Sequence, residues 1–409
     1  MTLTTPEVLI TVPRLITAAA GSGIVAPGYV AVAGRVVTAV GQGDPPRAPD
    51  VALPGGVLLP GFVDLQVNGY FGEEFLTAGA DGWARVSTRL PQTGTTAFLP
   101  TFVTAPPGVL TAGLRAASAV IPALPAGARV LGVHVEGPFI SPARKGAHNE
   151  AWITEPSADA VAELLDAGRG VLRLVTLAPE RSGAMAAITA LTEAGVLVSI
   201  GHSDATARQV AEAADHGARM VTHLFNAQRP MHHREPGVVG QALTDPRLTS
   251  GLIADLHHVS AQVCVLAFRA APGRICAVTD AAACAGMPPG SYKLGGEAIE
   301  LPPGDGEPPV RGDGTLAGSG LRMDAAVANL VAAGIGLAEA VSAATRIPAD
   351  LIGRPDLGRI APGAAADLAW LGDDLRTRAT WVGGELAYAS PADQSGIPHG
   401  RAHRDVHAD

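Results

Sequence analysis

Four segments of the sequence place a side chain that can bind a metal ion or move a proton at the end of an apolar run. In chain order these side chains are Glu136 in VLGVHVEGP, His202 in VLVSIGHS, His223 in ARMVTHLFN and Asp280 in RICAVTDA. Each run is typical of a buried β-strand, and a parallel barrel gathers its catalytic groups at the carboxyl ends of its strands. The pattern predicts a hydrolytic metal site.

Glu136, His202 and His223 have the chemistry of a metal-ligand set. The two histidines are 21 residues apart, the length of one helix and one strand, which places them on adjacent barrel strands. Two imidazoles and a carboxylate suit Zn²⁺, Fe²⁺ or Co²⁺ and leave a position open for water. The alternatives are an ion pair between Glu136 and an arginine, and histidines that are packed or capping. His134, two residues before Glu136, either supports this site or is simply packed.

Asp280 and several loop residues offer further chemistry on the same face. Asp280 can accept a proton from metal-bound water, whose pKa falls to about 7, and pass it to a leaving amine, although aspartate is also a favoured helix cap. His148 in KGAHN and one of the tandem His257 and His258 offer hydrogen-bond donors. Arg234 in REPG has a guanidinium that matches phosphate, although a lone arginine is usually a surface residue.

Strand-like apolar runs alternate with amphipathic stretches through the middle of the chain. Helical spacing follows Ser157, follows Ser203 or Asp204, and recurs over residues 327–334. Eight such alternations predict an α/β fold with a (β/α)8 TIM-like barrel. A doubly wound open sheet is the alternative, but GFVDLQVNG after its first strand is not a glycine-rich phosphate turn. The candidate strands are 57–67, 95–103, 129–136, 171–177, 196–201, 218–223, 250–256 and 274–279.

The two ends of the chain have a different pattern. Residues 7–54 and 366–390 hold short alternating apolar runs broken by glycine, which is typical of small antiparallel strands. We therefore expect a small β-sandwich domain formed from both termini. The predicted bounds are 1–55 and 366–395 for its two halves, 56–365 for the catalytic barrel and 396–409 for a loose, histidine-containing tail.

Composition narrows the class of protein. The 409 residues are 47% hydrophobic and 16% charged, enough for an extensive core. A net charge of −9 without a long basic run argues against a nucleic-acid partner, and no apolar run reaches the roughly 18 residues of a membrane span. The N-terminus lacks the pattern of a secretory signal, and three cysteines without CxxC spacing support neither disulfides nor a cysteine zinc site. We expect a cytoplasmic protein.

Seven motif groups together resemble those of the N-acetylglucosamine-6-phosphate deacetylase family of the amidohydrolase superfamily. They cover most of the chain, and the later GRIAPGAAADLAWL resembles the return into the small β domain that is common to the superfamily. In order, the motifs are GFVDLQVNG, HVEGPFI with KGAHN, GHSDA, THLFNAQRPMHHREPG, IADLHHV, VTDAAACAGMPPGSYKLGG and LAGSGLRMD.

The resemblance implies metal-dependent hydrolysis of the acetamide of N-acetyl-D-glucosamine 6-phosphate, giving glucosamine 6-phosphate and acetate. It implies one divalent metal ion per subunit, zinc in the first place, with iron, cobalt or manganese as alternatives. Its members resemble homodimers, so Arg234 is expected to reach the phosphate bound by a neighbouring subunit. The implied metal ligands are Glu136, His202 and His223, and the implied base and acid is Asp280. The implied substrate contacts are His148, Asn226, Ala227, Arg234 and His258.

One triplet departs from the superfamily pattern. Members with two metals carry His-x-His at the end of the first strand, whereas this chain has Gln66 and Asn68 around Val67. Amides are poor ligands for a transition metal, so we expect a single metal ion, as in the subset of the deacetylase family that shares Gln-x-Asn. Gln228 and Arg322 replace a common methionine and a common threonine, and the sequence assigns them no role.

Two alternative functions stay open at this point. The first is the same reaction on N-acetylgalactosamine 6-phosphate or another N-acyl substrate, because the sequence does not distinguish the epimers. The second is a non-catalytic barrel that acts in assembly, as in superfamily relatives without metal. The presence of all three candidate ligands and of Asp280 argues against the second.

Overall fold

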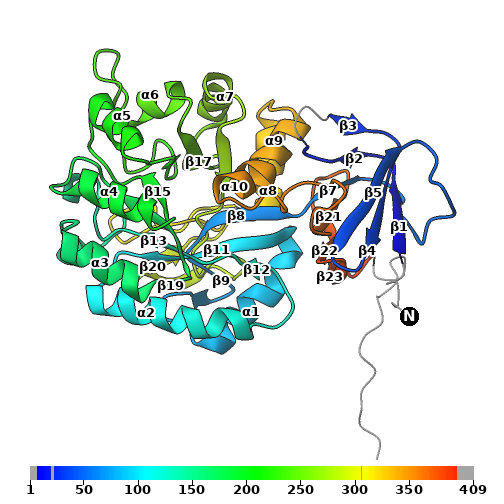
Figure 1. Cartoon of the computed structure of the whole chain (residues 1–409), viewed down its shortest axis with the longest axis horizontal. Helices are drawn as coiled ribbons and strands as arrows, with labels where there is room; N and C mark the ends of the chain where they lie inside the picture. The colour runs from blue at the N-terminus through cyan, green and yellow to red at the C-terminus, as the bar shows by residue number, and fades with distance from the viewer. Residues whose placement is uncertain (1–6, 20–22, 305, 394–409) are drawn as a thin grey trace, which may run out of the picture.

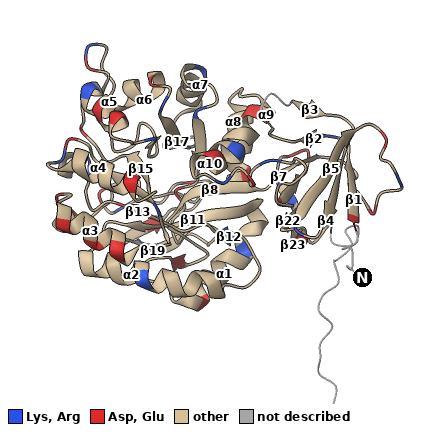
Figure 2. Ribbon diagram, in the orientation of Figure 1, with Lys and Arg blue, Asp and Glu red and all other residues tan. Residues whose placement is uncertain are grey.

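An α/β barrel occupies the middle of the chain, and an all-β domain formed from both ends packs beside it (Figure 1). This computed structural model describes residues 7–19, 23–304 and 306–393. The tail predicted at 396–409 lies outside the described residues. Figure 2 shows acidic and basic residues interspersed along the outer helices. Among the described residues, none of the helices combines the length and the apolar character that crossing a membrane requires.

Eight parallel strands form the barrel, each paired with the next in chain order. Backbone hydrogen bonds close the ring between the last strand and the first, from Asp280 N to Gln66 O and from Asn68 N to Ala281 O. The predicted (β/α)8 barrel is therefore confirmed. Its strands are β8 (Phe62–Val67), β11 (Thr95–Val103), β13 (Val133–Glu136), β14 (Leu172–Leu177), β15 (Leu197–Ile200), β16 (Met220–Val221), β17 (Thr249–Ile253) and β18 (Ile275–Val278).

The first predicted strand, 57–67, is two strands in two different sheets. β7 (Val57–Pro60) pairs with β2 (Leu15–Ile16) and β21 (Leu368–Leu371) of the small domain. The barrel strand begins only at Phe62, after Gly61, where a Cβ would meet the Thr96 side chain at 2.2 Å. Every residue of β7 and β8 is buried, and Asp64 and Gln66 are the polar residues in an otherwise apolar run. The pattern therefore does not show that the two halves enter separate cores.

Helices cover the outside of the barrel. α3 (Ala158–Ala167) begins after Ser157, whose side chain accepts a hydrogen bond from Ala160 N, as predicted. α5 (Ala207–Asp215) begins later than predicted, because Thr206 and Gln209 form a capping box there. The other helices are α1 (Ala80–Arg89), α2 (Pro107–Val120), α4 (Ala184–Glu193), α6 (Gly237–Thr244), α7 (Ala261–Ala270), α8 (Met323–Ala332), α9 (Leu337–Ala344) and α10 (Arg346–Leu351).

The small domain consists of two sheets that enclose one apolar core, which includes Ile10, Val30, Leu58 and Trp370. The first sheet has the order β5-β4-β1-β6 and the second the order β23-β22-β21-β7-β2-β3. The strands not yet given are β1 (Glu7–Val12), β3 (Ile24–Val25), β4 (Gly28–Ala33), β5 (Val36–Gln42), β6 (Val51–Ala52), β22 (Thr377–Val382) and β23 (Glu385–Ala389).

Arg322 links the two parts of the molecule. Its guanidinium donates to both oxygens of the buried Asp324 and to the backbone carbonyl of Gln92. Asp324 in turn accepts hydrogen bonds from the backbone and hydroxyl of Thr377 on β22. Arg322 therefore has a structural role that the sequence did not indicate.

Candidate functional site

A cavity of about 190 Å³ lies at the carboxyl ends of the barrel strands. Of the tandem histidines, His258 lines this cavity and His257 is exposed. Arg234 is exposed on the loop after β16 and does not line the cavity within its own chain. The other predicted site residues all line it: Glu136, His148, His202, His223, Asn226, Ala227, His258 and Asp280.

Three of these side chains stand where the backbone turns sharply at a strand end. His202, His223 and Asp280 have φ angles of 47°, 27° and 52°, in the left-handed region that residues other than glycine rarely adopt. Such strain persists only where surrounding contacts hold it, and it concentrates at functional sites. The local backbone thus supports the site that the sequence predicted.

Glu136, His202 and His223 present their ligand atoms to one point. Glu136 Oε1 lies 3.2 Å from His202 Nε2 and 3.0 Å from His223 Nε2, and the two nitrogens are 3.1 Å apart. A tetrahedral zinc ion with ligands at about 2.0–2.1 Å would place neighbouring ligand atoms about 3.3–3.4 Å apart. The three residues therefore fit a divalent cation.

The charges of this group also suit a cation. Burial alone would raise the pKa of Glu136, but the facing imidazoles of His202 and His223 hold that pKa well below its ordinary value. Burial lowers the pKa of His223, yet the Glu136 carboxylate raises it overall. The buried carboxylate of Glu136 therefore favours a positive charge beside it, and a bound cation would supply that charge.

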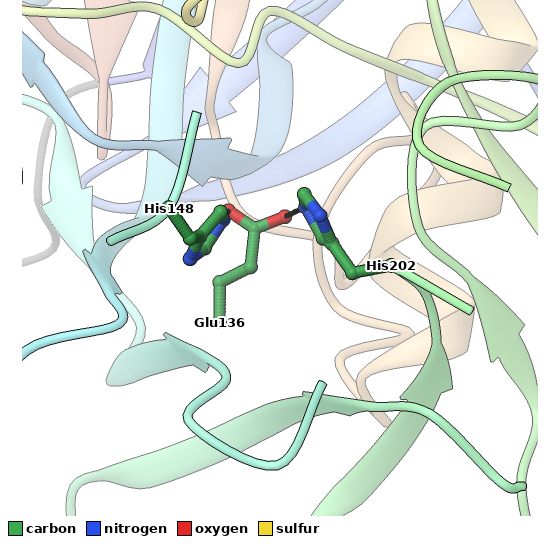
Figure 3. A group of neighbouring side chains, drawn as sticks. All are labelled: Glu136, His148 and His202. Atoms are coloured by element: carbon green, nitrogen blue, oxygen red, sulfur yellow. Dashed lines mark hydrogen bonds and ion pairs between the residues drawn. The ribbon is translucent and has the colours of Figure 1, made fainter. Parts of the chain in front are cut away.

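His148 is an alternative third ligand, since ligand atoms of Glu136, His148 and His202 lie within 4.8 Å of one another. Figure 3 shows the two imidazoles on opposite sides of the carboxylate. However, His148 Nε2 is 3.9 Å from Glu136, farther than either nitrogen of the closer set. His148 Nδ1 instead faces Thr104, at 2.7 Å from its Oγ1 and 3.3 Å from its backbone N, which leaves Nε2 as the ring nitrogen nearest Glu136. This geometry favours His223 as the third ligand.

The chain is similar to known proteins along most of its length. The amidohydrolase family model matches residues 57–387. The chain is a member of the amidohydrolase family. It is 42% identical over 359 residues to the human N-acetylglucosamine-6-phosphate deacetylase, and the aligned region covers 83% of this chain and 85% of the human protein. It is 38% identical over 334 residues to the N-acetylgalactosamine-6-phosphate deacetylase of Escherichia coli O157:H7, covering 81% of this chain and 88% of that protein.

A solved structure is also similar along nearly the whole chain. The N-acetyl-D-glucosamine-6-phosphate deacetylase of Mycobacterium smegmatis has a TM-score of 0.88 and 35% identity, covering 93% of this chain and 99% of that one. A mutant of the same mycobacterial protein was solved in complex with N-acetyl-D-glucosamine-6-phosphate. Within the amidohydrolase family, the chain belongs with the N-acetylglucosamine-6-phosphate deacetylases, as the motifs predicted.

In this amidohydrolase, the amides of Gln66 and Asn68 hold the carboxylate of Asp280. Gln66 Nε2 donates to Asp280 Oδ1 (2.9 Å) and to Glu136 Oε1 (3.1 Å), and Asn68 Nδ2 donates to the same Oδ1 (2.7 Å). Among the described residues, none hydrogen-bonds to Asp280 Oδ2, so that oxygen is left for a group in the cavity. Burial and the nearby charge of Glu136 raise the pKa of Asp280 to about 6, a value suited to a group that accepts and returns protons.

Neighbouring residues orient the cavity side chains, and sequence reasoning missed them. Asp255 accepts a hydrogen bond from His258 Nδ1 at 2.6 Å, which turns that ring into the cavity. Gln228 bridges the turn around His223 by donating to Thr222 O and accepting from Phe225 N. Asp255 is three residues before His258, and Gln228 is five residues after His223. The available sequence signals for these contacts were therefore the spacing in IADLHH and the polar glutamine after HLFN.

Proposed function

We propose that this chain hydrolyses N-acetyl-D-glucosamine 6-phosphate to glucosamine 6-phosphate and acetate. The observation that carries the proposal is the convergence of Glu136, His202 and His223 on one point, with Asp280 in the same cavity. Its similarity to deacetylases over more than four-fifths of the chain supports the choice of substrate. Retention of the complete set disfavours a non-catalytic barrel.

Five residues that line the cavity are assigned parts in this reaction. A divalent cation held by Glu136, His202 and His223, zinc in the first place, would polarise the acetyl carbonyl and lower the pKa of the attacking water. Asp280 takes the proton of that water on Oδ2 and delivers it to the departing amine nitrogen. Burial lowers the pKa of His148 to about 3, so its ring is neutral, and we assign its Nε2–H as the donor toward the carbonyl oxygen.

The sugar phosphate is proposed to occupy the other side of the cavity. Asn226, Ala227 and His258 line that side, on the loops after β16 and β17. The phosphate needs a cationic side chain beside it, and we assign this role to Arg234 of a second subunit. Arg234 is exposed and does not line the cavity of its own chain. The protein is accordingly proposed to be a homodimer. Its three cysteines are free and buried, which fits a reducing cytoplasm.

Acetate release from the purified chain tests the proposal. The 6-phosphates of N-acetylglucosamine and N-acetylgalactosamine are compared by kcat/KM, with Asp280→Asn as the inactive control. The glucosamine epimer should be the better substrate. A higher kcat/KM for the galactosamine epimer would mean that the proposed reaction is right and the proposed substrate is wrong. This epimer is included because the chain is similar to the N-acetylgalactosamine-6-phosphate deacetylase of Escherichia coli. Absence of acetate from both sugars would overturn the proposal.

A further inference from the structure

A hairpin that follows β18 supplies one wall of the cavity. Its strands, β19 (Gly290–Leu294) and β20 (Glu297–Leu301), pair antiparallel, and Leu294 at the end of the first is 7% exposed and lines the cavity. Leu294 packs in a small apolar cluster of its own with Val103 and Ile299, separate from the main barrel core. The hairpin turn is fixed by a hydrogen bond from Gly295 N to Glu74 (2.7 Å).

A second, much smaller cavity lies directly behind this wall. Its volume is about 10 Å³, close to that of a single water-sized sphere. Four residues line both cavities: Val103, Ala147, His148 and Leu294. The apolar side chains of Val103 and Leu294 therefore form a partition between the two spaces.

The reacting atoms determine which part of a substrate meets the partition. Under the proposed function, the carbonyl carbon lies beside the metal ligands and Asp280, and the sugar extends toward Asn226 and His258 beyond β16 and β17. In the order of the barrel strands, β16 and β17 stand opposite β11 and β13. Val103 ends β11 and Glu136 ends β13. Because the methyl group leaves the carbonyl on the side away from the amide nitrogen, it points toward Val103 and Leu294.

We propose that Leu294, together with Val103, closes the acyl end of the site and restricts the substrate to short N-acyl groups. The inference rests on the proposed function. An acetyl methyl reaches the partition, and each further methylene meets the Leu294 side chain. One methylene in an apolar pocket changes kcat/KM by roughly 10–200-fold, so this contact is enough to select acetyl.

The test compares N-acetyl-, N-propionyl- and N-butyryl-glucosamine 6-phosphate in the metal-loaded wild type and in Leu294→Ala. Wild type should lose about tenfold or more in kcat/KM with each methylene. Leu294→Ala joins the two cavities and should raise the butyryl-to-acetyl ratio by about tenfold or more. Val103→Ala opens the same partition from the barrel side and should raise the ratio even if Leu294→Ala loosens the hairpin.

Leu301→Ala is the matched control. Leu301 packs on the same apolar cluster from β20 but lines neither cavity, so its removal should leave the ratio at the wild-type value. The inference falls if both Leu294→Ala and Val103→Ala hydrolyse the acetyl substrate with an unchanged ratio, or if Leu301→Ala raises the ratio equally. A wild type that releases no acid from the acetyl substrate would instead refute the proposed function, on which the inference rests.

Discussion

His202 Nε2 and His223 Nε2 lie 3.1 Å apart, and both face the same oxygen of Glu136. The Nδ1 atom of His202 donates to the backbone carbonyl of Arg144 at 3.0 Å, so a neutral His202 ring carries its lone pair on Nε2. A lone pair beside a carboxylate oxygen is repelled unless a proton or a cation lies between them. This relationship is the reason to expect a metal ion at this point.

We predict about one tightly held divalent ion per chain. Gln66 and Asn68 direct amide N–H groups at Asp280, and such donors repel a second cation. Elemental analysis after gel filtration measures the metal content. A content close to two, with activity that follows the second ion, would contradict this prediction.

Asp204 is predicted to set the metal affinity through His202. Its carboxylate accepts hydrogen bonds from Arg144 (2.8 Å) and Arg229 (2.7 Å), and so holds the turn whose carbonyl orients the His202 ring. Changes in such outer contacts typically lower metal affinity about 10–100-fold, and Asp204→Asn should do the same. Competition with a chelator measures the affinity directly. Asp356→Asn, which alters a surface pair with Arg354, is the control and should leave the affinity unchanged.

Asp280→Asn should retain the metal ion but lose most of its turnover. The amide keeps the shape of the side chain yet cannot accept the proton of the attacking water. General acid–base groups contribute on the order of 10²–10⁴-fold, so kcat should fall by that factor. Metal content and kcat are measured on the same sample. A near-normal kcat would mean that Asp280 has only a structural role and that another group acts as the base.

The sequence was sufficient for Glu136, His202, His223 and Asp280, because each follows an apolar strand and parallel strands must bring their ends together. It was not sufficient for the contacts that orient them. Gln66 reaches Asp280 across 214 residues of chain, and the pairing appears only when the barrel closes. Spacing alone did not choose between His257 and His258. The family resemblance gave His258, and the structure adds the contact with Asp255 that orients its ring. The boundary at Gly61 was missed because both adjoining strands are buried throughout and largely apolar.

Asp64 gives a prediction for stability against pH. Burial raises its pKa to about 7, although Thr279 and the backbone of Gln66 donate to its carboxyl group. Between the unfolded pKa near 3.8 and about 7, the native state therefore binds more protons than the unfolded state. The contribution of Asp64 to the free energy of unfolding is complete below the unfolded pKa and is lost as pH rises through about 7.

Asp64→Asn mimics the protonated carboxyl group and should remove this dependence. Urea unfolding at about pH 5 and about pH 8 measures how much the free energy of unfolding falls between these two pH values, for the wild type and for the variant. The wild type should lose on the order of 2–3 kcal/mol more than the variant over this interval. Any change in the free energy of unfolding that the substitution causes equally at both pH values cancels in this comparison. Equal losses would show that Asp64 is ionised in the native state throughout this range.

The loop after β16 is predicted to complete the site of a second subunit. It exposes Met231, at 53%, beside His232, His233 and Arg234. An exposed apolar side chain among cationic or protonatable groups suits an interface near a dianionic phosphate. A charge-assisted arginine contact contributes roughly 1.5–3 kcal/mol. Arg234→Ala should therefore raise KM for the phosphorylated sugar by about ten- to a hundredfold, with little effect on the unphosphorylated sugar.

Hybrid dimers decide whether Arg234 acts across the interface. A mixture of Arg234→Ala and Asp280→Asn subunits pairs one intact base with one intact arginine. At a substrate concentration well below the KM of Arg234→Ala, dimers that exchange subunits should therefore be more active than either parent. Arg208→Ala is the control variant, because it removes an exposed arginine on α5. Its homodimer should have an unchanged KM. Subunit exchange is verified by differential tags and mass measurement. If hybrids form and regain nothing, Arg234 serves its own subunit, because a shared site requires that the intact arginine of one chain meet the intact Asp280 of the other.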